Sequence, residues 1–163
     1  MVLVLPDISV LMDLERGGLL ELSFCCNLPL VVPDLLYNRE LERENGPYLR
    51  SLGLGVVTLA SKEMSIAQQV YREAQALTLP ACFAISYAGR PGHALLCGER
   101  VAKNEAASRG CQVFGLLWLL DQMAVSKSVP KTSLSEGLNR ISSKSRTLLS
   151  RDEVALRLKA WRE

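Results

Sequence analysis

Short apolar runs alternate with amphipathic segments along most of the chain. The apolar runs occupy residues 2–5, 28–32, 56–59 and 94–97, with a shorter one at residues 112–114. Runs of this length are typical of buried strands. Apolar residues at helical spacing lie between them, at residues 8–16, 34–43, 61–74, 80–88, 99–108 and 116–123. The alternation predicts an α/β fold, a three-layer α/β/α sandwich around a mostly parallel sheet of four or five strands.

Two further helices are predicted beyond residue 124. Ser133 with Glu136 matches the capping box that starts many helices, and Ser150 with Glu153 matches it again. Apolar residues follow the two boxes at helical spacing, namely Leu134, Leu138 and Ile141, and then Val154, Leu158 and Trp161. We therefore expect two amphipathic helices whose apolar faces cover a neighbouring surface.

Charge separates the same two parts of the chain. Residues 125–163 carry nine basic and four acidic side chains, a net charge of +5, which leaves −3 for residues 1–124. We expect residues 1–124 to form one domain and residues 125–163 a basic helical extension, packed on that domain or on a partner. On charge alone, the extension is best explained as a solvated helical surface.

Composition excludes several kinds of site. His93 is the only histidine, which excludes zinc sites built from several histidines and mechanisms with two imidazoles. Aromatic residues make up 6%, which argues against a base-stacking surface. The five cysteines are odd in number and form no CxxC pair, as expected in a reducing compartment. Without a signal-peptide pattern or an apolar stretch long enough to span a bilayer, we expect a cytoplasmic protein with no membrane anchor.

Three acidic residues follow predicted strands. Asp7 comes directly after the first strand, Glu40 lies in the helix after the second, and Glu99 comes directly after the fourth. The carboxyl ends of parallel strands share one edge of a sheet, and ligands bind there in such folds. Carboxylates without histidine suit Mg²⁺ or Mn²⁺, which can activate water to hydrolyse a phosphodiester. Taken singly, Asp7 and Glu99 are explained at least as well as helix-start residues that interact with the helix dipole.

Four stretches of the chain stand out by their motifs and their order. They are VLPDISVLMDLERGG at residues 4–18, LVVPDLLYNRELE at 30–42, LTLPACFAISYA at 77–88 and ALLCGERVAKNEAASRGCQVFGLLWLLDQM at 94–123. They resemble, in turn, four motifs of the PIN domain: its first strand with a leading aspartate, its second strand and glutamate-bearing helix, its leucine-serine-x-x-aspartate helix, and its threonine-glycine-aspartate turn. The resemblance spans residues 2–124.

The PIN domain is the fold of many small metal-dependent ribonucleases, including toxins of toxin–antitoxin pairs. The resemblance therefore implies an endoribonuclease that uses Mg²⁺ or Mn²⁺ on RNA, with an antitoxin protein as a partner and a tendency to form homodimers. It places Asp7 at the first acidic position and Glu40 at the glutamate. The register near Glu40 is open, because a stricter spacing lands on Arg39, and Glu42 or Glu44 is a further option.

The other two acidic positions of the family are altered here. Ala81 stands where the third acid is usual, and a cysteine-glycine-glutamate turn ending at Glu99 replaces threonine-glycine-aspartate. Because Mg²⁺ tolerates little distortion and a two-metal site needs ions about 4 Å apart, we expect at most one weakly bound ion. Two functions follow. One is a ribonuclease in which Asp7, Glu40 and Glu99 bind the ion and form the catalytic site. The other is a catalytically inactive PIN-like module that binds RNA or a protein.

The basic extension offers a second candidate surface. Four of its cations could rim an RNA groove or meet an acidic antitoxin segment: Arg140, Lys144, Arg146 and Arg151. Its helices either fold back on their own domain or pack on a second copy of the chain, which would make a homodimer.

Two weaker hypotheses concern single side chains. His93 and Cys97 lie on one face of a predicted strand and could form a nucleophile pair, although Cys97 more simply packs as a small apolar residue. Asp34 or Glu105 could replace the carboxylate that is missing at Ala81.

Overall fold

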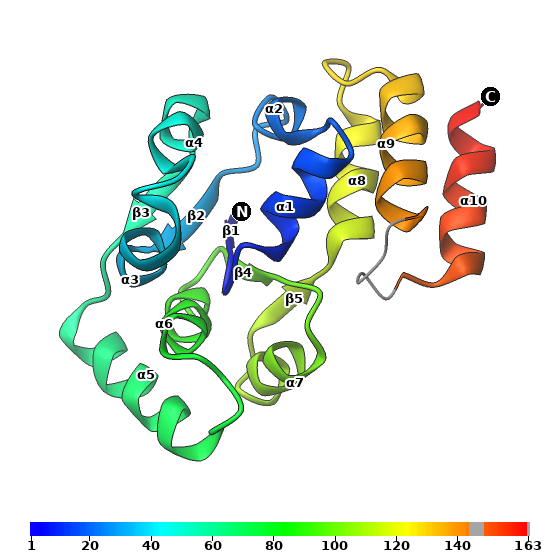
Figure 1. Ribbon diagram of the computed structural model, residues 1–163. Helices are drawn as coiled ribbons and strands as arrows, with labels where there is room; N and C mark the ends of the chain where they lie inside the picture. The colour runs from blue at the N-terminus through cyan, green and yellow to red at the C-terminus, as the bar shows by residue number, and fades with distance from the viewer. Residues whose placement is uncertain (144–148, 163) are drawn as a thin grey trace.

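The computed structural model describes residues 1–143 and 149–162, and a parallel sheet forms the centre of this part of the chain. The strands are β1 (Val2–Val4), β2 (Leu30–Pro33), β3 (Gly55–Val57), β4 (His93–Leu96) and β5 (Gln112–Phe114). Neighbouring strands all pair in parallel, in the order β3-β2-β1-β4-β5 (Figure 1). The predicted α/β class with a parallel sheet is confirmed.

The strand order reverses once, beside β1. The chain passes from β1 to β2 and β3 on one side, and then returns to the other side of β1 for β4 and β5. In open α/β sheets the crevice at such a reversal, beyond the carboxyl ends of the strands, is the usual place for a ligand. Here the reversal lies between β1 and β4.

Helices cover both faces of the sheet and enclose two apolar cores. Side chains alternate along each strand, so Leu3 enters one core and Val4 the other, and Leu96 and Leu95 divide in the same way. The first core is covered by α1 (Ser9–Arg16), α2 (Leu20–Ser23), α4 (Gly46–Leu52), α8 (Leu116–Val125) and α9 (Lys131–Ser143). The second is covered by α5 (Ser61–Glu73), α6 (Leu79–Ala88) and α7 (Arg100–Ser108). These layers form the predicted three-layer sandwich.

Helices α5 and α6 differ in how much of their surface is buried. Helix α6, whose residues are almost all apolar, is buried from Pro80 through Ala88. In α5 the core-facing residues are Ala67 and Val70, whereas Ile66 is exposed. The spacing of alanine and valine therefore set the buried face of α5.

The helix expected at residues 34–43 has two parts. It begins as α3 (Asp34–Leu36) and continues as a π-helix, η1 (Tyr37–Leu41), in which the N–H of Glu42 donates to the carbonyl of Tyr37 at 2.8 Å. Gly46, at the start of α4, packs directly against the carbonyl of Leu41, where any Cβ would collide. This close approach holds α4 against the π-turn. Such turns are rare and often occur at functional sites.

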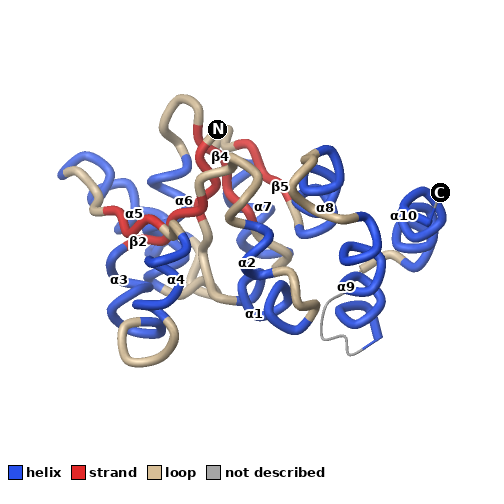
Figure 2. Tube along the Cα trace, turned by 90° about the horizontal axis from the view of Figure 1, so that it is seen from above, coloured by secondary structure: helices blue, strands red, loops and turns tan. Residues whose placement is uncertain are grey.

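The C-terminal helices pack on the rest of the chain. Helix α9 contacts α1, and α10 (Arg151–Arg162) contacts α9 at the outer edge of the molecule (Figure 1 and Figure 2). One of the two hydrogen bonds of the second predicted capping box is present, since Ser150 Oγ accepts the N–H of Glu153 at 3.4 Å. The first is wrong: α9 begins at Lys131, so Ser133 lies inside the helix. In the described part of the chain, no helix is long and apolar enough to cross a membrane.

Candidate functional site

Two of the predicted acids lie at the strand-order reversal. Asp7 follows β1 and Glu99 follows β4, so both occupy the carboxyl edge where the sheet changes direction. Asp7 is half-buried, and its Oδ1 accepts the N–H of Ser9 at 2.9 Å, in the turn that leads into α1. Its placement follows directly from the short strand and the proline that ends it.

Glu99 is the N-cap of α7. Its Oε1 accepts the N–H of Val101 and its Oε2 accepts the N–H of Ala102, both at 2.8 Å. An N-cap satisfies backbone N–H groups that have no partner within the helix, and a carboxylate there also interacts favourably with the helix dipole. Both carboxylate oxygens of Glu99 therefore accept a hydrogen bond from the helix, as the helix-start interpretation of Glu99 predicted.

Cys97 lies at the same edge, directly after β4. Burial raises the pKa of the Cys97 thiol to about 11, and the negative charges of Asp7 and Glu99 add to this rise. The thiol therefore stays protonated near neutral pH. His93 begins β4, and four steps along a strand separate the two residues by about 13 Å. Its ring contacts Tyr87 and the Pro91 carbonyl, so a His93–Cys97 nucleophile pair is not formed.

Glu40 lies in a different place, a surface cleft between α1 and the π-helix. The cleft has a volume of about 350 Å³. Its lining comes from α1, from η1 and from the start of α4: Ile8, Leu11, Met12, Glu15, Glu40, Leu41, Glu44, Asn45 and Leu49. Glu40 thus shares a site with Glu15 and Glu44, and Asp7 and Glu99 do not line it.

The acids of the carboxyl edge do not fit a well-held divalent ion. Ala81 is buried and offers no oxygen ligand, and Glu99 already accepts two backbone hydrogen bonds. Lys103 brings a positive charge to the same edge, with Nζ 3.4 Å from where a Cβ of Gly115 would stand. Within residues 1–143 and 149–162, no three side chains of His, Cys, Asp or Glu gather in a group that could hold a metal ion.

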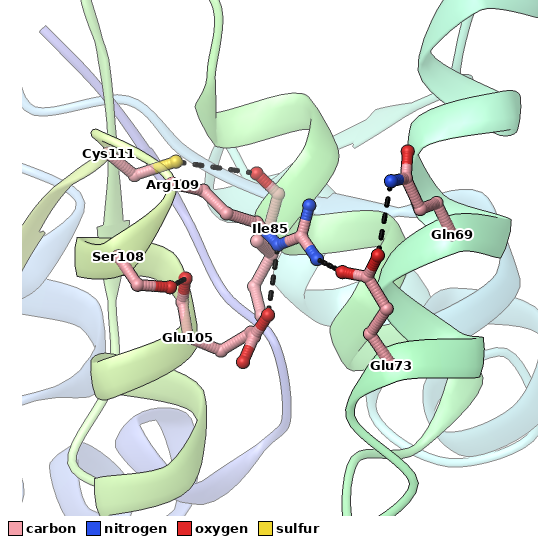
Figure 3. A network of polar contacts seen from close by, with 7 residues as sticks. All are labelled: Gln69, Glu73, Ile85, Glu105, Ser108, Arg109 and Cys111. Atoms are coloured by element: carbon pink, nitrogen blue, oxygen red, sulfur yellow. Dashed lines mark hydrogen bonds and ion pairs between the residues drawn. The ribbon is translucent and has the colours of Figure 1, made fainter.

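The substitutes considered for the missing acid are engaged elsewhere. Asp34 accepts the N–H of Leu35 at 2.7 Å and the hydroxyl of Thr58 at 3.2 Å. Glu105 accepts from Arg109 Nε at 3.0 Å, and Arg109 also pairs with Glu73 of α5 (Figure 3). Arg109 therefore links α7 to α5, and Glu105 serves this link between the helices.

Residues near Glu40 divide between cleft and solvent. Glu44 lines the cleft, whereas Arg39 and Glu42 are exposed and do not line it. The sequence did not single out Glu15, although a signal was there. Ile8, Met12 and Glu15 recur at intervals of four and three, which places them on one face of α1.

The predicted basic surface is only partly described. Arg140 Nη1 lies 3.4 Å from the carbonyl of Gly17, at the C-terminal end of α1, and its Nη2 lies 3.8 Å from Glu136. Arg151 is exposed at the start of α10. Lys144 and Arg146 lie outside the described residues. Arg140 therefore contacts the end of α1, and the rest of its side chain is exposed.

Comparison with models of known families, with curated proteins and with solved structures finds no match to this chain.

Proposed function

We propose that the chain is a catalytically inactive PIN-like module that acts by binding another protein. The observation that carries the proposal is the state of Glu99, whose two carboxylate oxygens both cap α7. Together with Ala81 at the third acidic position, this leaves Asp7, of the two acids at the strand-order reversal, with a carboxylate oxygen that accepts no hydrogen bond within residues 1–143 and 149–162. A single carboxylate oxygen holds Mg²⁺ poorly, because the ion needs near-octahedral oxygen ligands.

The charge of the cleft favours protein over RNA as the partner. Glu15, Glu40 and Glu44 line it, and none of them forms an ion pair within the described residues. Carboxylates repel the phosphates of RNA and attract lysine and arginine. The five free cysteines fit a reducing compartment, and we place the protein in the cytoplasm on that ground.

A cleavage assay tests the inactivity. The protein and its Asp7→Asn variant are incubated with end-labelled single-stranded RNA in Mn²⁺ and, separately, in Mg²⁺. We expect no cleavage above the level of the variant. The melting temperature of the wild type should also change no more with Mn²⁺ than that of Asp7→Asn, because an ion bound to the native state must stabilise it. Cleavage that depends on Asp7 would overturn the proposal.

The second candidate is the ribonuclease of reduced activity. The observation that favours it is the position of Asp7 and Glu99 on the two strands that flank the strand-order reversal. In this alternative Asp7 and Glu99 hold one Mg²⁺ or Mn²⁺ ion, and Glu40 has to reach it from the wall of the neighbouring cleft. The same assay decides between the two functions, since only this alternative predicts loss of cleavage in Asp7→Asn.

A further inference from the structure

The cleft between α1 and the π-helix has the composition of a peptide-binding site. Leu11, Leu41 and Leu49 form an apolar floor that is buried within the first core. Met12 also lines the cleft and is 49% exposed. The leucines are almost fully buried, so the apolar area open to a partner comes from the partly buried Ile8, the N-cap of α1, and from Met12, four residues further along the helix.

The rim of the cleft is acidic on two sides. Glu15 comes from α1, and Glu40 and Glu44 come from the opposite wall. These carboxylates form no ion pair with another side chain of residues 1–143 or 149–162, although other acids of the chain, such as Glu63 and Asp121, are paired with arginine. The rim thus presents negative charge that the described part of the fold does not neutralise.

One wall of the cleft is formed by the π-helix and is backed by α4. Glu40 and Leu41 belong to η1 and lie in this wall. Gly46, the first residue of α4, packs against the Leu41 carbonyl, so α4 contacts the wall from behind. A preformed site loses less conformational entropy on binding than one that must be ordered. At about 350 Å³ the cleft is at the small end of ligand pockets, which suits a few side chains of a segment.

From these features we infer that the cleft binds a short segment of another protein that carries an apolar anchor flanked by lysine or arginine. The apolar anchor packs on Ile8 and Met12, and the flanking cations meet Glu15, Glu40 and Glu44. The inference rests on the proposed function of the chain as a protein-binding module, and it names the site and the chemistry of the partner. It differs from the acidic antitoxin segment considered for the basic extension, because the charge of this surface is opposite.

Selection from a random 12-residue peptide display library tests the inference. The full chain is immobilised, and peptides that also bind the Glu15→Lys/Glu40→Lys/Glu44→Lys variant are removed first. We expect the remaining peptides to be enriched in lysine and arginine next to leucine, isoleucine, phenylalanine or methionine. Peptides without such enrichment, or no peptides that distinguish the wild type from the variant, would overturn the inference.

A matched pair of single variants then tests the site. One selected peptide is labelled with fluorescein and its dissociation constant is measured by anisotropy. Glu40→Lys and Glu42→Lys change the net charge equally and lie two residues apart, but only Glu40 lines the cleft. We expect Glu40→Lys to weaken binding about tenfold or more, and Glu42→Lys by less than about twofold, because charge attraction at longer range is screened by salt. Equal weakening by both would mean unspecific attraction and would contradict the inference.

Two controls separate this inference from the proposed function. A thermal melt of each variant confirms that it is folded, which is expected because the substituted glutamates are at the surface. Competition with a single-stranded RNA oligonucleotide shows whether RNA uses the same cleft. Displacement of the peptide by RNA would overturn the choice of a protein partner. Asp7-dependent RNA cleavage without such displacement would overturn the inactivity of the module and leave the peptide site intact.

Discussion

Gly17 and Gly137 pack backbone against backbone where α9 crosses the end of α1. A Cβ on Gly137 would lie 2.8 Å from the Gly17 carbonyl oxygen and 2.6 Å from a methyl carbon of Leu19. A Cβ on Gly17 would in turn lie 3.1 Å from the Gly137 carbonyl oxygen. Real Cβ atoms essentially never come as close as 2.8 Å to such an atom. This contact is therefore where the C-terminal helices dock on the sheet domain.

The contact predicts that Gly137→Ala destabilises the protein. Alanine favours a helix over glycine by about 1 kcal/mol, so a helix without the tight contact would gain stability. Here the added methyl group must push α9 away from α1, and such overpacking typically costs about 1–3 kcal/mol. We expect a net loss of about 1 kcal/mol in the free energy of unfolding, measured by urea denaturation. Gly98→Ala is the control, since its Cβ would meet nothing within 4 Å.

The fold could be predicted from the sequence because the short apolar runs fit few structures other than buried strands. A run of apolar residues such as 2–5, closed by Pro6, fits a buried strand, and the amphipathic segments between such runs allow only crossover helices. The start of α9 was missed because a Ser-x-x-Glu spacing also occurs inside helices. Pro130, directly before Lys131, was the better signal, since its carbonyl accepts the N–H of Leu134.

The site was harder to predict than the fold. Asp7 and Glu99 were correctly expected at the carboxyl edge, because that follows from the strands alone. The role of Glu99 could not be read from its position, since a residue between a strand and a helix can either cap the helix or face a ligand. The place of Glu40 depends on the i→i+5 turn of η1, and no residue pattern in the sequence announces a π-turn.

The Glu63–Arg90 pair predicts a stability change at acidic pH. Arg90 Nε and Nη2 donate to the two carboxylate oxygens of Glu63 at 2.6 and 2.7 Å, and these hydrogen bonds lower the pKa of Glu63 from its ordinary value of 4.5. A carboxyl group with a lowered pKa in the folded state stabilises the fold above pH 4.5. The stabilisation is lost as the pH falls below 4.5, through the folded-state pKa.

Glu63→Gln measures this contribution. We expect the variant to be less stable than the wild type at pH 7 by about 1 kcal/mol, in the upper range for a well-oriented ion pair near the surface. At pH 3 the difference should be smaller, because Glu63 of the wild type is then partly protonated. Thermal melts at both pH values test this. Glu42→Gln, at an exposed position without an ion pair in the described part of the chain, should change little at either pH. An equal difference at pH 7 and pH 3 would contradict the assignment.

Arg157 is predicted to hold α10 on the domain. Its Nε and Nη2 donate to the carboxylate of Asp121 in α8 at 2.8 and 2.7 Å, and its Nη1 donates to Glu153 at 3.0 Å. Lysine cannot reproduce this two-pronged geometry. We expect Arg157→Lys to increase amide hydrogen exchange across residues 151–162, measured by mass spectrometry, while exchange in β1 and β4 stays the same. Arg162→Lys, exposed on the same helix, is the control and should leave the exchange of α10 unchanged.

The cap formed by Glu99 gives a last prediction, which separates its structural role from a metal-binding one. Glu99→Ala removes the acceptor of two backbone N–H groups, and loss of an N-cap costs about 1 kcal/mol. We expect this loss in metal-free buffer with EDTA, measured by urea denaturation. Asparagine is among the best N-cap residues and carries no charge, so Glu99→Asn should recover most of the lost stability. If Glu99 instead served to hold a cation, its removal in EDTA would relieve repulsion with Asp7, and Glu99→Ala would be as stable as the wild type or more stable.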